Sequence, residues 1–412
     1  MNGRSTRHRL LGALCLAGVA CGSSSSSAPS ASASVEAPKT KVIEAADNED
    51  VDASSSAKAS DQAVVAIPAG KFESGSTPGD KGRNPITEPT LAVVELGAFD
   101  IDRAPWPNEL GKPPLVNVTR DRAAELCKSK GRRLCTELEW EHACKGPGDD
   151  LYAGRAAWDP ACAKDPSSCA SGFGVVGMGS IRELVVGDIG EVKDLLAAGP
   201  VARGAAPSAP APDHRCARRS PVSTSTTAED LGFRCCGGPQ NLATIAAPPW
   251  KQTFTRVEFS TDKARELFAT VPQLRKLGDT IKYFDEDNAK RVVQKPQKPE
   301  AADVPKGITL TTSALGWSPV PGEDLLLLTG QAGDDSFIVA FYQLPEDRYR
   351  VGSTMVFHKE KGPIVLGFNG YDGRRQKDKA RATLDWATCW KCPGESGLIT
   401  YKEDGRVTIT QE

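Results

Sequence analysis

The sequence is poor in histidine and, after its first twenty residues, has no long apolar run. Only four histidines occur among the 412 residues, scattered without the close H-x-x-x-H spacing of a metal site, at His8, His142, His214 and His358. We therefore predict no metal site and no bound cofactor. No later stretch reaches the roughly eighteen apolar residues that a transmembrane helix needs. P-loop, G-x-S-x-G and dinucleotide-binding motifs are also absent from the sequence.

Neither sign of charge is in excess. Lysine and arginine together number 51, aspartate and glutamate 53, and the formal net charge is −2. Loss of the first twenty residues would remove three arginines and no acid, which takes the charge from −2 to −5. A chain of this charge has little attraction for a polyanion, so we predict no nucleic-acid partner.

The N-terminus has the pattern of an export signal. Three arginines precede an apolar run at 10–20, which is too short to span a bilayer as a helix. Small residues then lead to Cys21 as at the cleavage site of a lipoprotein, although Gly18 stands where leucine is usual. We predict that residues 1–20 are a lipoprotein signal peptide and that Cys21 carries the lipid that anchors the chain to a membrane. Cleavage of a plain signal peptide near Ala20 is the alternative.

Composition divides the rest of the chain into a tether and two folded parts. Residues 21–62 are rich in serine and alanine and offer almost nothing that can be buried, so we predict a disordered tether. A chain of 412 residues is long enough for two domains, and its composition changes near a Gly-Gly-Pro at 237–239. We predict one domain at 63–240, a linker at 241–252 and a β-rich domain at 253–412.

Hydrophobic periodicity and capping residues predict elements in both domains. The first domain should contain strands at 64–70 and 91–96, a helix at 120–130 after Thr119 as N-cap, and a helix from a capping box at Thr136 to residue 144. The span 145–234 reads as loop-rich, so cross-links must help to hold it. The second domain should contain a helix at 262–277 and strands at 254–259, 324–328, 336–343, 350–357, 364–368, 398–402 and 406–410. A sandwich and a barrel both stay open for these strands.

Four short segments between 67 and 236 carry a family pattern. They are IPAGKFESG at 67–75, FDIDR at 99–103, VNVT with GRRLCTELEWE at 116–119 and 131–141, and RCARRS with DLGFRC at 215–220 and 230–235. In this order they resemble IPAGxFxMG, FxIDxxEV, VSWxDA with GKRLPTEAEWE, and RCAARS with NLGFRC of the formylglycine-generating (sulfatase-modifying) enzyme family. The last two are the specific ones. The resemblance implies an α+β fold related to C-type lectins, with long loops.

Charged residues of the third segment are expected to be scaffold. Trp140 should be a core aromatic. Arg132 and Arg133 should pair with carboxylates at the start of the following helix, at Glu137, Glu139 or Glu141.

The residues that the family uses for catalysis are missing. Its oxidases have two cysteines ten and five residues before the cysteine of RCAARS, and these positions are Ala206 and Ala211, which offer no thiolate to a copper ion. The family's GNVWEW element corresponds to GSIREL, where Ser180 replaces an asparagine that helps to hold calcium. The three-histidine iron site of the related sulfoxide synthases has no counterpart. We therefore predict no catalytic residue and no metal ligand in this domain.

Disulfide bonds are expected from the cysteine content. Ten cysteines remain after Cys15 leaves with the signal and Cys21 takes lipid, and an even number in an exported protein favours pairing. The resemblance implies two family bridges, and an extra pair and two local closures complete the set of Cys127–Cys235, Cys144–Cys216, Cys135–Cys236, Cys162–Cys169 and Cys389–Cys392. Exchange of Cys235 with Cys236 stays open. So does a redox role for the last pair, although a turn and not a helix follows it.

These observations favour a non-catalytic, exported lipoprotein of the bacterial cell envelope, in the periplasm or at the outer membrane. Its first domain would be a binding or scaffold module for a protein or glycan ligand, and the β-rich domain a second interaction surface. Two alternatives stay open. One is an oxygen- or metal-dependent enzyme of the same superfamily with an altered site, and the other is a thiol–disulfide protein that works through Cys389 and Cys392.

Overall fold

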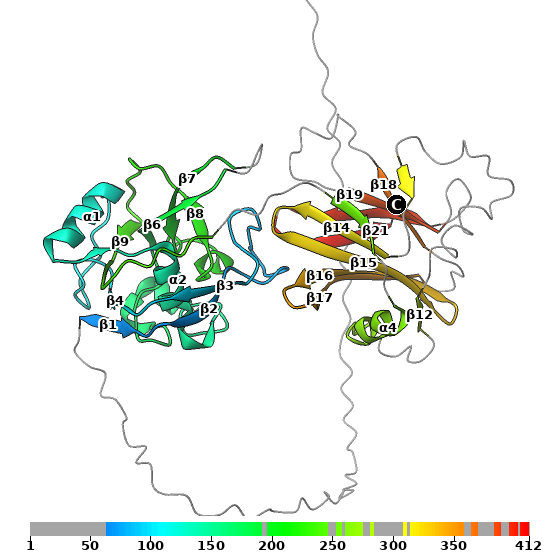
Figure 1. Ribbon diagram of the computed structural model, residues 1–412, viewed down its shortest axis with the longest axis horizontal. Helices are drawn as coiled ribbons and strands as arrows, with labels where there is room; N and C mark the ends of the chain where they lie inside the picture. The colour runs from blue at the N-terminus through cyan, green and yellow to red at the C-terminus, as the bar shows by residue number, and fades with distance from the viewer. Residues whose placement is uncertain are drawn as a thin grey trace, which may run out of the picture. The chain divides into compact units, whose positions relative to one another are not determined.

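The computed structural model describes residues 63–191, 196–245, 253–257, 260–274, 281–283, 308–310, 314–357, 364–369, 383–388, 395–402 and 404–411. The predicted signal, the tether, Cys21, His358, Cys389 and Cys392 lie outside these residues. Within them the chain is a mixture of few helices and several sheets, nearly all antiparallel (Figure 1). No helix in the described part is long and apolar enough to cross a membrane.

Short strands open the first part of the fold. Its central sheet has the order β1-β4-β10-β5, made of Val64–Ile67, Phe99–Asp102, Cys235–Gly237 and Arg133–Leu134. A separate ribbon pairs β2 (Gly70–Ser74) with β3 (Ala92–Leu96). The single strand predicted at 64–70 is therefore wrong. The chain leaves β1 at Pro68, which has no N–H to continue the ladder, and pairs with a different partner from Gly70 onwards.

Two helices flank strand β5, and both begin at the predicted caps. Helix α1 (Arg120–Ser129) starts after Thr119, whose side chain accepts a hydrogen bond from the backbone of Arg122. Helix α2 (Glu137–Lys145) starts with the capping box of Thr136 and Glu139. All nine residues of α2 are buried, Trp140 completely, so this helix lies at the centre of its part of the protein.

The span predicted as loops contains a sheet. Strands β6 (Arg182–Ile189), β7 (Gly199–Arg203), β8 (Arg219–Pro221) and β9 (Leu231–Phe233) pair in the order β8-β7-β6-β9, with β6 and β9 parallel. Three of these strands have five residues or fewer, and in β6 three consecutive residues are buried, so the alternation that marks a strand in sequence is absent. Short helices α3 (Ala161–Lys164), η1 (Gly146–Gly148), η2 (Pro166–Ser168) and η3 (Ala211–His214) lie in the loops.

Four disulfide bonds hold this part together, which confirms the prediction that the chain contains them. The pairs are Cys127–Cys235, Cys135–Cys236, Cys144–Cys216 and Cys162–Cys169, the same partners that were assigned above from the family pattern and from proximity. Neighbouring Cys235 and Cys236 reach opposite ways from β10, because successive side chains on a strand point to opposite faces. Disulfides in this number are typical of chains that fold outside the cytoplasm.

The second part consists of two sheets packed face to face. One has the order β11-β14-β15-β16-β17, with β12 paired to β15, and the other has the order β13-β18-β19-β20-β21. The strands of the first sheet are Thr253–Arg256, Ile281–Tyr283, Ala314–Val320, Glu323–Ala332, Asp335–Leu344 and Arg348–Phe357, for β11, β12 and β14 to β17. Those of the second are Ile308–Leu310, Val365–Asn369, Thr383–Ala387, Ser396–Tyr401 and Val407–Gln411.

Strand β15 explains why this part needs a helix. Its four consecutive leucines alternate between faces: Leu325 and Leu327 enter the core between the sheets, whereas Leu326 and Leu328 pack with residues of helix α4 (Thr261–Ala269). The helix predicted at 262–277 ends at Ala269 instead. The physical reason is Pro272, since the residue before a proline avoids the helical conformation.

Candidate functional site

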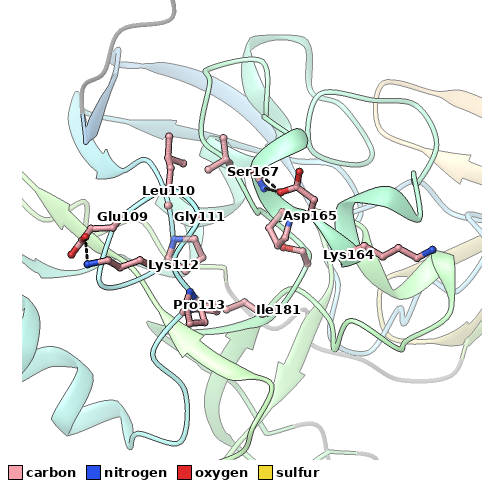
Figure 2. Close-up of a pocket in the computed structure, with 15 residues that line it drawn as sticks. Glu109, Leu110, Gly111, Lys112, Pro113, Lys164, Asp165, Ser167 and Ile181 are labelled. Atoms are coloured by element: carbon pink, nitrogen blue, oxygen red, sulfur yellow. Dashed lines mark hydrogen bonds and ion pairs between the residues drawn. The ribbon is translucent and has the colours of Figure 1, made fainter.

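A groove opens in the first part of the fold, between two loops that are far apart in sequence. Its volume is about 350 Å³, within the range of roughly 300 to 1,000 Å³ of small-ligand pockets. One wall is formed by residues 104–114, the other by 164–167, and the floor by 176–181 (Figure 2). The lining residues are Ala104, Pro105, Glu109, Leu110, Gly111, Lys112, Pro113, Pro114, Lys164, Asp165, Pro166, Ser167, Val176, Ser180 and Ile181.

Both walls are built to stay in place. Four of the lining residues are prolines, whose ring fixes one backbone angle and leaves no N–H to reorganise. The second wall is the loop that the Cys162–Cys169 disulfide closes, with α3 on one side and η2 on the other. Asp165 caps η2 by accepting a hydrogen bond from the backbone of Ser167 at 3.1 Å. The groove is therefore largely preformed.

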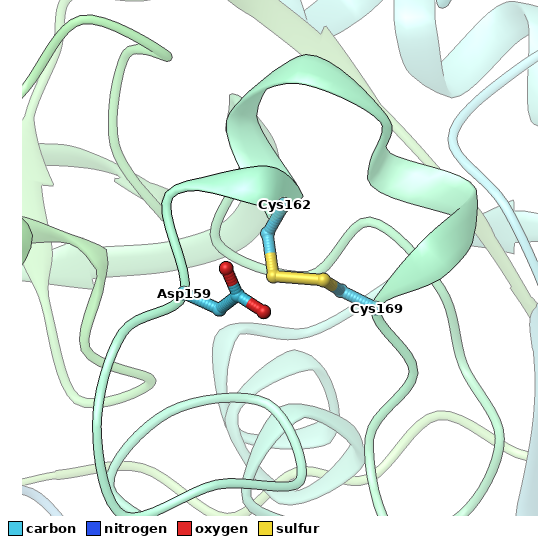
Figure 3. Close-up of side chains that lie close together, drawn as sticks. All are labelled: Asp159, Cys162 and Cys169. Atoms are coloured by element: carbon cyan, nitrogen blue, oxygen red, sulfur yellow. A yellow bond between two sulfur atoms is a disulfide. The ribbon is translucent and has the colours of Figure 1, made fainter.

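The disulfide at the base of this wall also rules out a metal at the same place. Asp159 brings a carboxylate close to the sulfurs of Cys162 and Cys169, a grouping of ligand atoms that could hold an ion if the sulfurs were thiolates (Figure 3). They are bonded to each other, and a disulfide sulfur is a poor ligand. Asp159 is instead bound to Arg155 and to the backbone of Ala161.

The floor depends on a glycine. Gly177 has a φ of +71°, and a Cβ at this position would meet Pro166 at 3.2 Å and Pro105 at 3.5 Å. It therefore lies between the two walls, where a side chain would strain the backbone and fill the hollow. Its neighbours are tied down: Gly177 donates to the carbonyl of Cys169 at 3.1 Å, and the Ser180 hydroxyl donates to that of Gly177 at 2.6 Å.

A buried ion pair supports the floor from below. The Arg234 guanidinium binds the Glu183 carboxylate through two hydrogen bonds of 2.6 and 2.7 Å, and neither side chain is exposed. Arg234 also donates to the carbonyl of Val176 at 3.2 Å. Glu183 comes from the degraded GNVWEW-like element and Arg234 from the GFRC-like segment. The structure thus assigns these two residues a role as scaffold beneath the groove.

Helix α2 carries the other buried carboxylates. Arg133 binds Glu139 through two hydrogen bonds of 2.7 Å, as predicted. The prediction for Arg132 is wrong: it pairs with Asp100 and Asp102 of β4. Consecutive side chains around β5 point to opposite faces, so only one of the two arginines can reach α2. The remaining partners of α2 come from further along the chain, since Arg203 and Arg219 bind Glu137.

Two of these carboxylates titrate in opposite directions. Burial raises the pKa of Glu141, but Arg203 at 2.9 Å and Lys145 outweigh it, so the pKa of this carboxyl lies below its usual range. Burial raises the pKa of Asp102, and its hydrogen bond from the Cys235 backbone and the Arg132 charge do not outweigh this effect. Each carboxylate has a structural partner, and none of those discussed here lines the groove.

Segment 204–214 lies against the far side of the groove floor. A Cβ on Gly204 would meet the Ile181 carbonyl at 2.3 Å. The ring of His214 stacks on Trp158 at 3.9 Å, and its two nitrogens lie 2.7 and 3.0 Å from the carbonyls of Gly179 and Ala209. Both nitrogens are thus used to hold the segment. Its positions 206 and 211, where the family's oxidases have cysteines, are partly exposed and exposed alanines.

The other described histidine is also a packing residue. His142 is buried in α2 between Phe72 and Phe173, with ring centroids 4.7 and 5.2 Å away. Burial lowers its pKa. The structure does not bring His142 and His214 into one ligand set: His142 packs in α2, and both nitrogens of His214 are taken by carbonyls.

Comparison with known proteins leaves the family open. No known family profile matches the chain, and no curated protein matches it. Variable protein 1 of Treponema denticola is 16% identical with a TM-score of 0.33, and the match covers 43% of this chain and 95% of that one. PvdO of Pseudomonas aeruginosa is 20% identical with a TM-score of 0.31, covering 42% and 93%. CarF is 16% identical with a TM-score of 0.32, covering 42% and 97%. Scores of this size do not establish a shared fold.

The groove was not predicted from the sequence. One signal for it was present: four prolines occur between 105 and 114, at Pro105, Pro107, Pro113 and Pro114, which favours a stiff loop. The predicted closure of Cys162–Cys169 was a second. Neither indicates that the two loops, about fifty residues apart, face each other.

Proposed function

We propose that this chain is an exported, lipid-anchored protein of the cell envelope, and that residues 63–240 are a non-catalytic binding domain of the formylglycine-generating-enzyme type. The observation that carries the proposal is the groove. It is a preformed apolar hollow, and beside it lies the segment in which alanines stand where the family's oxidases have cysteines. Such a site suits the binding of a ligand better than chemistry on it.

The state of the cysteines supports a non-catalytic role. All eight cysteines in the described residues belong to the four disulfides, so this part of the chain offers no thiolate to a metal. Oxidation of a peptide cysteine to formylglycine needs a metal or a reactive thiol, because ordinary side chains do not activate oxygen. The family assignment itself rests on the four sequence segments, and the contact between Glu183 and Arg234 is consistent with it because it joins two of them.

We expect the full chain to leave a sulfatase-type cysteine peptide unchanged. The detergent-solubilised protein would be incubated with copper, oxygen, a reductant and the peptide, and the peptide mass followed by mass spectrometry. An active formylglycine-generating enzyme, run in parallel, provides the positive control. Turnover above a metal-free control would contradict the proposal and favour an enzyme with an altered site.

The lipid anchor is tested separately. In a bacterial host, the wild-type chain should incorporate labelled fatty acid and sediment with membranes, whereas Cys21→Ser should do neither and should retain its signal. The reason is that only the thiol of Cys21 can accept the lipid before cleavage. Cys15→Ser, within the predicted signal, is the matched control and should behave like wild type. Membrane attachment and processing of Cys21→Ser like the parent would refute the anchor.

A further inference from the structure

We infer that the groove binds an extended segment of another protein, which inserts one aliphatic or aromatic side chain and places a carboxylate near Lys164. This inference rests on the proposed function and specifies its ligand.

The hollow itself is apolar because its charged residues turn outwards. Glu109 and Lys112 form an ion pair with each other on one side, and the Lys164 side chain extends away from the hollow on the other (Figure 2). Facing inwards between them are Pro113, Ile181 and the backbone of the two walls. At the mouth, Leu110 is 49% exposed, which is unusual for a leucine and leaves apolar surface available to a partner. An apolar centre with a charged rim is the anatomy of a protein-binding hot spot.

Polar recognition inside the groove is nearly used up. The Ser180 hydroxyl is bound to Gly177 and the Ser167 hydroxyl to Asp165. The lining contains no aromatic ring and no asparagine or glutamine side chain, and its prolines have no N–H to donate. A sugar needs several donors and acceptors to replace its water shell, usually with an aromatic face beside them. An apolar side chain needs neither, so these walls favour a polypeptide over a glycan.

Charge selects among polypeptides. Lys112 is neutralised by Glu109, and Asp165 serves its own loop as a cap. Lys164 forms no ion pair within the described residues and is exposed at the end of α3. A partner carboxylate beside the apolar anchor would therefore meet a free ammonium group, whereas a basic partner would find no unpaired acid in its place. The flexible lysine stem allows the ammonium to reach a ligand at the rim.

The inference is tested with a random peptide library displayed on phage and selected on the immobilised full chain. Selected peptides would be synthesised, and their dissociation constants measured by fluorescence anisotropy. We expect a shared apolar residue with an acidic neighbour. Leu110→Asp should weaken binding at least about tenfold, because it puts a charge at the apolar mouth. Lys164→Glu should weaken it by about three- to tenfold, and less at high salt.

Two matched variants control for general effects. Leu242→Asp changes another exposed leucine, 82% exposed and outside the groove, and Lys128→Glu changes an exposed lysine of α1. Both should bind the peptides like wild type. Circular dichroism shows whether each variant is folded, and Leu110→Ser, which adds no charge, replaces Leu110→Asp if that variant is not. Opening the wall with Cys162→Ala and Cys169→Ala together should also weaken binding.

Several outcomes would overturn the inference. One is a library that yields no binding peptide, and another is a peptide whose affinity Leu110→Asp leaves unchanged. Binding of soluble glycan fragments that Leu110→Asp abolishes would make this a glycan site instead. Self-association of the chain that Leu110→Asp abolishes would make the partner a second copy. None of these results depends on oxidase activity, so they are distinguishable from failure of the proposed non-catalytic role.

Discussion

Replacing Arg234 by methionine should lower the free energy of unfolding of the sheet beneath the groove by about 3 to 5 kcal/mol. The substitution leaves the Glu183 carboxylate fully buried without its partner, and this desolvated charge is the main cost. Hydrogen exchange of the amides of β6 and β9 measures the local free energy, because these strands carry the two residues or adjoin them.

The chain provides a matched control for this prediction. Arg182 and Asp230 form a similar two-bond pair, with distances of 2.6 Å, between the same two strands, but their side chains are 26% and 23% exposed. Arg182→Met should cost about 1 kcal/mol or less, since solvent screens this pair and can hydrate the carboxylate left behind. Equal losses in the two variants would show that burial does not decide the strength of the Glu183–Arg234 contact.

Joint replacement separates the charge effect from the packing effect. Glu183→Leu combined with Arg234→Met removes both charges, and the double variant should regain a large part of the stability lost by Arg234→Met alone. If it is as unstable as the single variant, the loss comes from packing or from the hydrogen bond to Val176 and not from an unpaired charge.

Removing the Cys127–Cys235 disulfide should produce the second large effect. The bond spans 108 residues, and on the chain-entropy model its loss through Cys127→Ala and Cys235→Ala costs about 4 to 5 kcal/mol. Urea unfolding under non-reducing conditions, followed by near-ultraviolet circular dichroism, provides the measurement.

The short disulfide is the control. Cys162 and Cys169 are seven residues apart, so the same model gives a cost of about 2 to 3 kcal/mol for Cys162→Ala with Cys169→Ala. We also expect that variant to change the groove wall more than the fold. A greater loss of stability from the short bridge than from the long one would mean that the entropy of the unfolded chain is not the main source of the stabilisation.

Features that depend on neighbouring residues were predictable from the sequence. The caps at Thr119 and Thr136 lie where a side-chain oxygen can reach a backbone N–H two or three residues ahead, so three or four letters suffice to identify them. The cysteine partners could be assigned because a family pattern and chain proximity restricted the choice. The run at 325–328 indicated a buried strand, but it could not indicate that one face meets a second sheet and the other a helix.

The segment order, the caps and the replacement of two cysteine positions by Ala206 and Ala211 follow from the sequence alone, because they concern residue types and short spacings. Which arginine meets which carboxylate depends on the tertiary structure. Arg132 and Arg133 are adjacent in sequence but point to opposite faces, and Glu183 finds Arg234 fifty-one residues away. The groove belongs to the same class: residues 104–114 and 164–167 form its walls because the sheets and the Cys162–Cys169 bridge bring them together, and no local pattern encodes that distance.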